Sequence, residues 1–131
     1  MTLGRTAAML LPFLALAAVG LATPRAGADD DGARRFSATI IGVGTTFGNL
    51  HTDLPVSNLG IANGQGFLVT CGEQTFDATL ADWYNDVEAG AWVGLTNPDG
   101  RLQIAINNGD ADQTSGCGQG DVLTITVNAA R

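Results

Sequence analysis

The sequence predicts an all-β fold: a small barrel or sandwich built in one domain. Several runs of five to nine residues are rich in β-branched and apolar side chains, and turn residues bound each run. Outside the N-terminal segment no window has the period of a long amphipathic helix, and no repeat recurs at solenoid spacing. The Gly-rich segment Asn107–Asp121 is predicted as loop, with one helical turn around Asp110–Thr114. These patterns are typical of short strands packed around a single core.

Five strands are predicted, and two of them alternate cleanly along the chain. The alternation in Arg101–Ile106 and Asp121–Val127 predicts that each of these strands buries one face. The stretch Asn97–Gly100, NPDG, predicts a hairpin turn, because proline fixes φ and glycine accepts positive φ. In chain order the predicted strands are Phe36–Gly44, Gly66–Gly72, Ala91–Thr96, Arg101–Ile106 and Asp121–Val127.

Residues 1–28 have the pattern of a secretory signal peptide. An arginine precedes an apolar run, and a small-residue exit, AGA, ends at Ala28. The run is shorter than the roughly 20 residues of a membrane-spanning helix, so we expect cleavage; the alternative is an uncleaved anchor. Residues 29–35 then form an acidic flexible leader, and residues 36–131 form the folded domain. We expect a secreted or periplasmic protein with no membrane span after signal cleavage.

The charge balance excludes two classes of partner. The chain has no lysine, and after residue 28 its four arginines face thirteen acidic residues, a formal charge of −9. Binding to nucleic acid or to an anionic membrane depends on clustered basic side chains. We therefore expect neither partner, and the charge says nothing more specific.

The chain has two cysteines, Cys71 and Cys117. In an oxidising compartment an even pair is most simply a disulfide, which here would close a long loop and stabilise the fold by roughly 4 kcal/mol. The alternatives are half of a metal site or a reactive thiol. Neither cysteine has a second cysteine or a histidine nearby in the sequence, so we predict the disulfide.

No catalytic or metal-binding constellation stands out in the sequence. His51 is the only histidine, too little for a zinc site together with two paired cysteines. The stretch NGDAD lacks the ligand spacing of a calcium loop, and no glycine pattern of a phosphate-binding loop is present. We therefore predict no catalytic residue, no metal and no cofactor.

Three stretches together resemble one known family. TTFGNLHTDL (Thr45–Leu54) resembles the D-x-F-G-N-x-x-T-N-I/L signature of the S-adenosyl-L-methionine hydroxide adenosyltransferases, which include the fluorinating and chlorinating enzymes. WYNDVEAGAWVGLTNPDGRLQIAINNGDA (Trp83–Ala111) and GCGQGDVLTI (Gly116–Ile125) resemble later segments of the same proteins, in order and at nearly the same spacing. The likeness covers Phe36 to Val127 and only the family's C-terminal domain, which implies a small β-barrel of mostly antiparallel strands.

The resemblance implies a ligand-binding half-site rather than a complete enzyme. In the family, a larger N-terminal α/β domain supplies the chemistry, and a barrel from a neighbouring subunit holds adenine and the methionine end of the substrate. Phe47, Gly48 and Asn49 match the F-G-N motif whose asparagine contacts adenine. The tentative ligand-binding residues are therefore Phe47, Asn49, Tyr84, Asp86 and Asn107. Tyr84 and Asp86 match an aromatic-x-acid pair, and Asn107 lies in Ile106–Asn108, which matches the backbone segment along the purine edge.

Other positions depart from the family pattern. The family's aspartate before the motif is Thr45, and its carboxylate-binding pair is Pro98-Asp99. Both changes weaken recognition of an amino acid by the sign of charge alone. A purely structural interpretation also stands: Phe47 in the core, Gly48-Asn49 as a turn pair, and Trp83 and Tyr84 as packing residues.

Three functions follow from these observations. The first is an exported, non-catalytic barrel that binds a nucleoside or other small molecule, or a protein partner. The second is half of an adenosyltransferase that a separate N-terminal domain completes. The third is a structural or interaction domain of the cell envelope.

Overall fold

The computed structural model describes residues 32–128. The predicted signal peptide, residues 1–28, lies outside the described residues. One compact unit starts at Arg34, where the first strand of the described residues also begins, inside the segment predicted as leader. No helix within residues 32–128 has the length and apolar character to cross a membrane.

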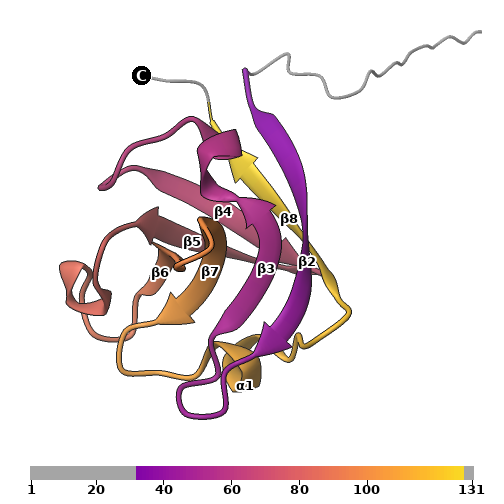
Figure 1. Cartoon of the computed structure of the whole chain (residues 1–131), viewed down its shortest axis with the longest axis vertical. Helices are drawn as coiled ribbons and strands as arrows, with labels where there is room; N and C mark the ends of the chain where they lie inside the picture. The colour runs from indigo at the N-terminus through magenta and orange to yellow at the C-terminus, as the bar shows by residue number, and fades with distance from the viewer. Residues whose placement is uncertain (1–31, 129–131) are drawn as a thin grey trace, which may run out of the picture. The chain divides into compact units, whose positions relative to one another are not determined.

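The regular secondary structure of the described chain is mostly β-strand, with one short α-helix and two 3₁₀ helices (Figure 1). The strands are β2 (Arg34–Val43), β3 (Leu50–Pro55), β4 (Gly66–Cys71), β5 (Gln74–Leu80), β6 (Trp92–Thr96), β7 (Arg101–Ile106) and β8 (Val122–Val127). The helical segments are η4 (Val56–Leu59), η5 (Tyr84–Asp86) and α1 (Ala111–Ser115).

The seven strands close into a barrel in the order β2-β3-β7-β6-β5-β4-β8, with β8 pairing again with β2. Every pairing is antiparallel except that of β5 with β6, which is parallel. This confirms the predicted all-β class and the barrel of mostly antiparallel strands. The NPDG turn joins β6 to β7 as predicted, with Gly100 at φ 82° and the Asn97 side chain accepting from the backbone N–H of Arg101 at 2.9 Å.

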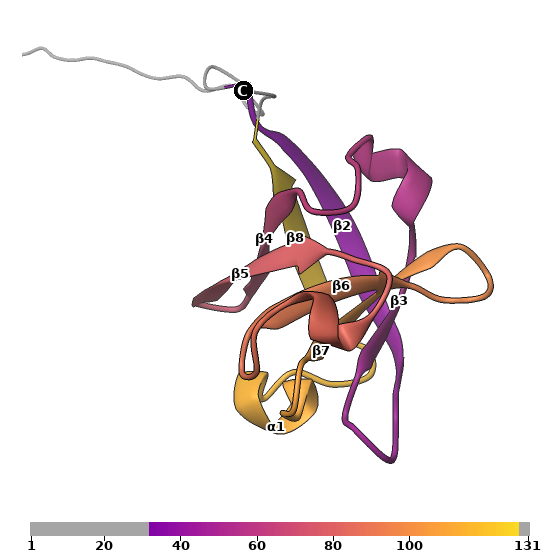
Figure 2. The same cartoon turned by 90° about the vertical axis from the view of Figure 1, so that its left-hand side faces the viewer.

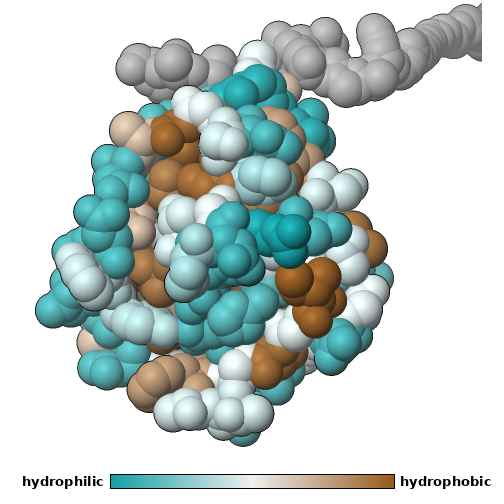
Figure 3. Space-filling model, in the orientation of Figure 1, coloured by the Kyte–Doolittle hydropathy of each residue, from teal (hydrophilic) through white to brown (hydrophobic). Residues whose placement is uncertain are grey.

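The interior of the barrel is filled by aliphatic side chains from every strand except β6. Leu102 and Ile104 of β7 and Ile125 of β8 are fully buried, which confirms the predicted buried face of each strand. The opposite face is buried as well at Ala105 and Thr126, so the alternation does not extend over the whole of either strand. Gly94 of β6 leaves room for a ring from across the barrel, because a Cβ there would lie 2.5 Å from Cζ of Phe67. The face shown in Figure 3 is hydrophilic apart from separate hydrophobic patches, as expected for strands with one buried face.

Two strands, β3 and β5, are absent from the sequence prediction. β3 falls in the region between a predicted strand and a loop, yet its Leu50, Thr52 and Leu54 alternate into the core. β5 buries Ala78 and Leu80 but exposes or half-buries its other side chains, so its apolar signal is weak. The helical turn predicted around Asp110–Thr114 is confirmed as α1.

A crossover joins the parallel strands β5 and β6 and covers the outside of the sheet (Figure 2). Val93 and Leu95 point away from the interior and pack with Ala105 in a second, smaller apolar cluster. Tyr84 and Val87 of the crossover pack against this cluster. Both faces of β6 are therefore buried, which is why its apolar run is continuous rather than alternating.

The predicted disulfide is present. Cys71, the last residue of β4, is bonded to Cys117, which follows α1, with 6.8 Å between the Cα atoms. Because both sulfurs are bonded to each other, neither the reactive thiol nor the metal half-site describes this pair.

Candidate ligand-binding hollow beside the Phe-Gly-Asn loop

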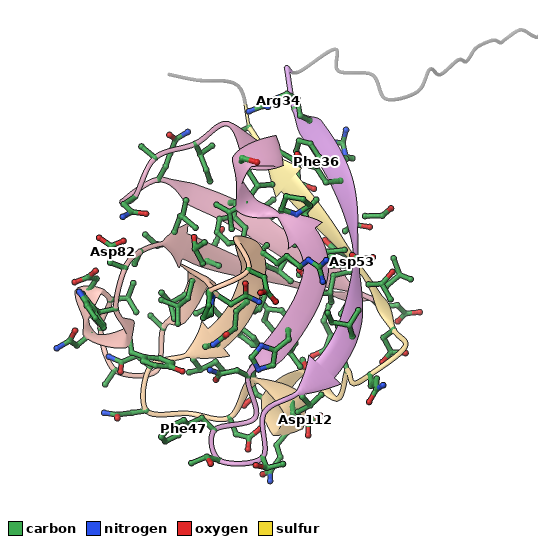
Figure 4. The ribbon with its side chains drawn as sticks, in the orientation of Figure 1. Arg34, Phe36, Phe47, Asp53, Asp82 and Asp112 are labelled. Atoms are coloured by element: carbon green, nitrogen blue, oxygen red, sulfur yellow. A yellow bond between two sulfur atoms is a disulfide. The ribbon has the colours of Figure 1, made fainter. Side chains whose placement is uncertain are left out.

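The loop between β2 and β3 is closed by its own backbone. Gly44 donates its N–H to the carbonyl of Asn49 at 2.8 Å, and Gly48 donates to the carbonyl of Gly44 at 3.1 Å. The carbonyl of Gly48 in turn accepts from the N–H of Asp112 at 3.0 Å, which ties α1 to the loop. Figure 4 shows Phe47 at this loop and Asp112 beside it, at one end of the barrel.

Gly48 is required at its position for two reasons. Its φ is 68°, a left-handed backbone conformation that residues with a side chain rarely adopt. A Cβ would also lie 2.0 Å from Oδ1 of Asp110. The glycine of the F-G-N motif therefore serves the backbone and the approach of α1. Its neighbour Asn49 does not share the left-handed conformation, since Asn108 is the only non-glycine residue in the described chain with positive φ.

Asn49 is a buried polar residue whose two side-chain atoms differ in their surroundings. The side chain is 5% exposed, and Nδ2 donates to the hydroxyl of Tyr84. Oδ1 is buried and has no hydrogen-bond partner among the described residues. An unpaired buried acceptor destabilises a fold by about 1–3 kcal/mol, so such atoms are rare and mark strain, water or a ligand.

Two aromatic residues lie near this asparagine: Tyr84, its hydrogen-bond partner, and Phe47, whose ring contacts Tyr84. Phe47 is 58% exposed, so its assignment to the core is wrong: it lies at the tip of a loop beyond the end of the barrel. Its ring centroid lies 6.1 Å from that of Tyr84, with the planes tilted by 58°. Tyr84 packs on the second apolar cluster, as a packing residue should, but Trp83 is 70% exposed and does not.

These rings border a hollow of about 450 Å³, which we call the aromatic hollow. Its volume lies in the range of small-molecule sites in proteins. No lysine, arginine or histidine is among its lining residues, so it offers stacking faces, amides and one carboxylate to a ligand. The lining residues are Thr46, Phe47, Tyr84, Ile106, Asn107, Asn108, Gly109 and Asp110.

Residues 38–124 match the family described as the SAM hydroxide adenosyltransferase C-terminal domain. The chain belongs to this family. The resemblance found in the sequence is thereby confirmed, and it concerns the C-terminal domain alone. No curated protein matches the sequence.

Two solved structures share the fold of this C-terminal domain. An uncharacterized conserved protein from Thermotoga maritima is 30% identical, with a TM-score of 0.66 over 70% of this chain and 35% of that one. A conserved hypothetical protein from Thermus thermophilus is 22% identical, with a TM-score of 0.51 over 79% of this chain and 38% of that one, and it supports the fold only. The chain thus spans little more than a third of either protein.

Four of the five residues predicted from the family motif gather at the aromatic hollow. Phe47, Tyr84 and Asn107 line it, and Asn49 lies behind Tyr84. Asn107 also holds the crossover in place, because its Nδ2 donates to the carbonyl of Val87 at 2.9 Å.

Asp86 does not line the aromatic hollow. One oxygen of its carboxylate accepts from the backbone N–H groups of Asp82 and Trp83, each at 3.2 Å. Asp86 therefore caps η5, the turn that carries Tyr84. The two residues of the aromatic-x-acid pair therefore have different roles: Tyr84 lines the hollow, and Asp86 stabilises the turn that carries Tyr84.

The positions that depart from the family motif lie elsewhere. Thr45 is an exposed residue of the β2–β3 loop, and Asp99 lies in the β6–β7 turn, where its N–H donates to Oδ1 of Asn97 at 3.0 Å. His51 is half-buried on β3 opposite Gln103 of β7. None of the three lines the aromatic hollow.

Sequence reasoning missed three lining residues: Thr46, Gly109 and Asp110. The close packing of Gly109, where a Cβ would lie 2.6 Å from Cγ2 of Ile106, is a local contact. Asp110 falls in the predicted helical turn, and it does cap α1, with Oδ1 accepting from the N–H of Gln113 at 2.8 Å. Its contact with Gly48 in the β2–β3 loop, by contrast, depends on tertiary structure.

Proposed function

We propose that this domain is an exported, non-catalytic module that binds a nucleoside, with its base in the aromatic hollow. The observation that carries the proposal is the buried, unpaired Oδ1 of Asn49 beside an aromatic pair, the exposed Phe47 and the half-buried Tyr84. The exocyclic amino group of adenine is a donor suited to this oxygen, and the faces of Phe47 and Tyr84 are suited to stacking on a base.

Binding to Asn49 would require a rearrangement of Tyr84. The Tyr84 hydroxyl accepts from Nδ2 of Asn49, and Tyr84 itself is half-buried. A base that bonds to the amide of Asn49 replaces this hydroxyl as its partner. The exchange satisfies both amide atoms, whereas the unliganded arrangement satisfies one.

Titration calorimetry of the purified protein with adenosine tests the proposal. We expect heat of binding for the wild type and an affinity about three- to tenfold lower for Asn49→Ala, the equivalent of one neutral hydrogen bond. Asn58→Ala, an exposed asparagine on η4, is the matched control and should bind as the wild type does. Equal binding by Asn49→Ala and wild type would remove Asn49 from the site.

The nucleoside itself is tested by the same titration. Without heat from adenosine or S-adenosylmethionine, and without a shift in melting temperature, the nucleoside proposal is wrong and a structural role in the cell envelope takes its place. Because Thr45 and Asp99 stand where the family grips the amino acid, we expect S-adenosylmethionine to bind no more tightly than adenosine.

A second candidate function has a specific observation in its favour. Phe47 and Trp83 are large, exposed aromatic side chains at or next to the aromatic hollow. Such residues are enriched where proteins meet partners. In this function a separate polypeptide with the family's N-terminal domain completes an adenosyltransferase site. Release of adenosine from S-adenosylmethionine, only when both polypeptides are mixed, would establish it.

Export is the remaining part of the proposal. It is supported by the signal-like pattern of residues 1–28 and by the disulfide, a bond that persists in oxidising compartments. Mass spectrometry of the protein from a fractionated native host tests it. We expect a mature chain that starts near Asp29, outside the cytoplasm; a cytoplasmic chain that retains residue 1 would contradict this part.

A further inference from the structure

The helix α1 is too short to hold its own position. It has five residues, with Asp110 as N-cap and Gly116 as C-cap in the left-handed conformation. Isolated helices shorter than about 12 residues are marginal in water. The place of α1 in the molecule therefore depends on what its two ends are attached to.

The C-terminal end of α1 is attached to the β4–β5 hairpin. Cys117 is bonded to Cys71, and Gln74 of β5 donates from Nε2 to the carbonyl of Ser115 at 2.7 Å. The hydroxyl of Ser115 accepts from the N–H of Cys117 at 3.0 Å and donates to the carbonyl of Ala111 at 2.7 Å. One covalent bond and one hydrogen bond thus join this end to the β4–β5 hairpin, and Cys117 is buried in the barrel's core cluster.

The N-terminal end of α1 is part of the aromatic hollow. Asp110 lines the hollow and lies against Gly48, and the N–H of Asp112 donates to the Gly48 carbonyl at 3.0 Å. Gly48 stands between Phe47, which borders the hollow, and Asn49. A shift of α1 must therefore move one wall of the hollow and the loop that carries the motif.

We infer that the Cys71–Cys117 disulfide positions this wall through α1, so that the aromatic hollow has its binding shape only while the two cysteines are bonded. The part of the inference that concerns ligand binding rests on the proposed function. The mechanical part, that the disulfide holds α1 in place, does not. The disulfide is a positioning element: neither cysteine lines the aromatic hollow.

The chemistry of the switch is thiol–disulfide exchange. A dithiol reduces the bond: its thiolate attacks one sulfur, the S–S bond breaks, and the dithiol leaves as a cyclic disulfide after supplying two electrons and two protons to the cysteines. Both cysteines are buried, but they border a second hollow of about 520 Å³, the side from which a reductant would approach. Glu73 and Asp121 border it too and repel anionic thiols, so dithiothreitol, an uncharged dithiol, is the suitable probe.

Hydrogen exchange with and without dithiothreitol tests the mechanical part, in the absence of any nucleoside. After reduction we expect the amides of Asp112 and Gln113 to exchange about tenfold faster or more, because their segment opens locally. Amides of β3 and β7 should keep their protection. If the α1 amides exchange at the same rate in both states, the inference is wrong.

Adenosine titration of the two redox states tests the consequence for binding. We expect the reduced protein to bind about tenfold more weakly than the oxidised protein, the equivalent of about 1.4 kcal/mol. If the oxidised protein binds no adenosine, the proposed function fails, while the exchange experiment still decides the coupling. If both states bind equally, the coupling to the hollow is wrong.

A variant that keeps the disulfide tests the same attachment of α1 without reduction, so unfolding on reduction does not affect the result. Gln74→Ala removes the hydrogen bond to Ser115 and leaves the cysteines bonded. We expect faster exchange at Asp112 and Gln113, by a smaller factor than reduction gives. Gln119→Ala, an exposed glutamine in the loop after α1, is the matched control. Unchanged exchange in Gln74→Ala overturns the role of this end of α1.

Discussion

At the scale of single residues, Gly48 carries two constraints at once. Its backbone is left-handed, and its Cα surface is the place where the carboxylate of Asp110 packs. An added methyl group therefore strains the loop and also displaces the residue that caps α1. The two effects can be measured separately, because another glycine has the first constraint without the second.

We expect Gly48→Ala to lower the free energy of unfolding by about 2–4 kcal/mol, the sum of the left-handed strain and a lost cap. Gly72→Ala is the control: its φ is 62°, and nothing lies within 4 Å of the added Cβ. It should lower the free energy by about 1–2 kcal/mol. Urea unfolding measures both variants. Equal losses would mean that Asp110 moves aside without consequence.

The sequence identified Asn49 but not the contact that defines it. Nothing in a local pattern links Asn49 to Tyr84, because 35 residues separate them and only the closed barrel brings them together. The misplacement of Phe47 has a similar cause. A phenylalanine is most often buried, whereas the direction of the β2–β3 loop decides that Phe47 projects outward.

At the scale of elements, the N-cap of α1 links a helix to the aromatic hollow. We expect Asp110→Ala to lower the free energy of unfolding by about 1 kcal/mol, since the N–H of Gln113 loses its acceptor. Asp110→Asn keeps an acceptor oxygen and should retain most of that stability. Thermal unfolding checks both. A loss for Asp110→Asn as large as for Asp110→Ala would show that the charge, not the cap, matters.

Thr52 holds β3 where its pairing with β7 shifts register. The Thr52 hydroxyl donates to the carbonyl of Leu102 at 2.7 Å and accepts from the N–H of Leu54 at 3.2 Å. Thr52→Val leaves both backbone groups without this partner, so we expect a loss of about 1–3 kcal/mol by urea unfolding. Thr75→Val, whose hydroxyl bonds to Thr70 in an exposed pair, should change stability by less than about 1 kcal/mol.

The element that Thr52 stabilises is also one that the sequence pattern hides. β7 and β8 are predictable because aliphatic residues alternate along them, whereas β3 places a threonine at a buried position and ends on Pro55. β5 is hidden because its buried residues include the small Ala78. Local hydrophobicity detects strands whose buried face is large and aliphatic, and it misses strands whose buried face is small or polar.

At the scale of the whole molecule, the disulfide closes the longest covalent loop in the described chain. The two cysteines are 46 residues apart. We expect the double variant Cys71→Ala/Cys117→Ala to lower the free energy of unfolding by roughly 4 kcal/mol. Guanidinium unfolding measures this, and dithiothreitol should lower the stability of the wild type only. A similar loss in the double variant on adding dithiothreitol would point to an effect unrelated to the bond.

The periodicity of the sequence could not predict that the strands close into a barrel. Alternation indicates an all-β class, but a sandwich fits the same strands equally well. The resemblance in Thr45–Leu54 and Trp83–Ala111 selected the barrel. Neither source indicated that β5 and β6 are parallel, since strand direction follows from the path of the crossover and not from the strands' own residues.

That crossover has a consequence for how the molecule can change. Antiparallel neighbours accept a connection of two residues, but parallel neighbours require the chain to travel back along the sheet. The segment between Leu80 and Trp92 is that return path, and it carries Tyr84. Hydrogen bonds to the barrel backbone hold its two ends, at Ala81 and at Gly90–Ala91, and between them the chain is bound by no strand register as long as it covers the second apolar cluster. One side of the hollow can be rebuilt, by insertion or by exchange of the whole segment, while every strand keeps its partners.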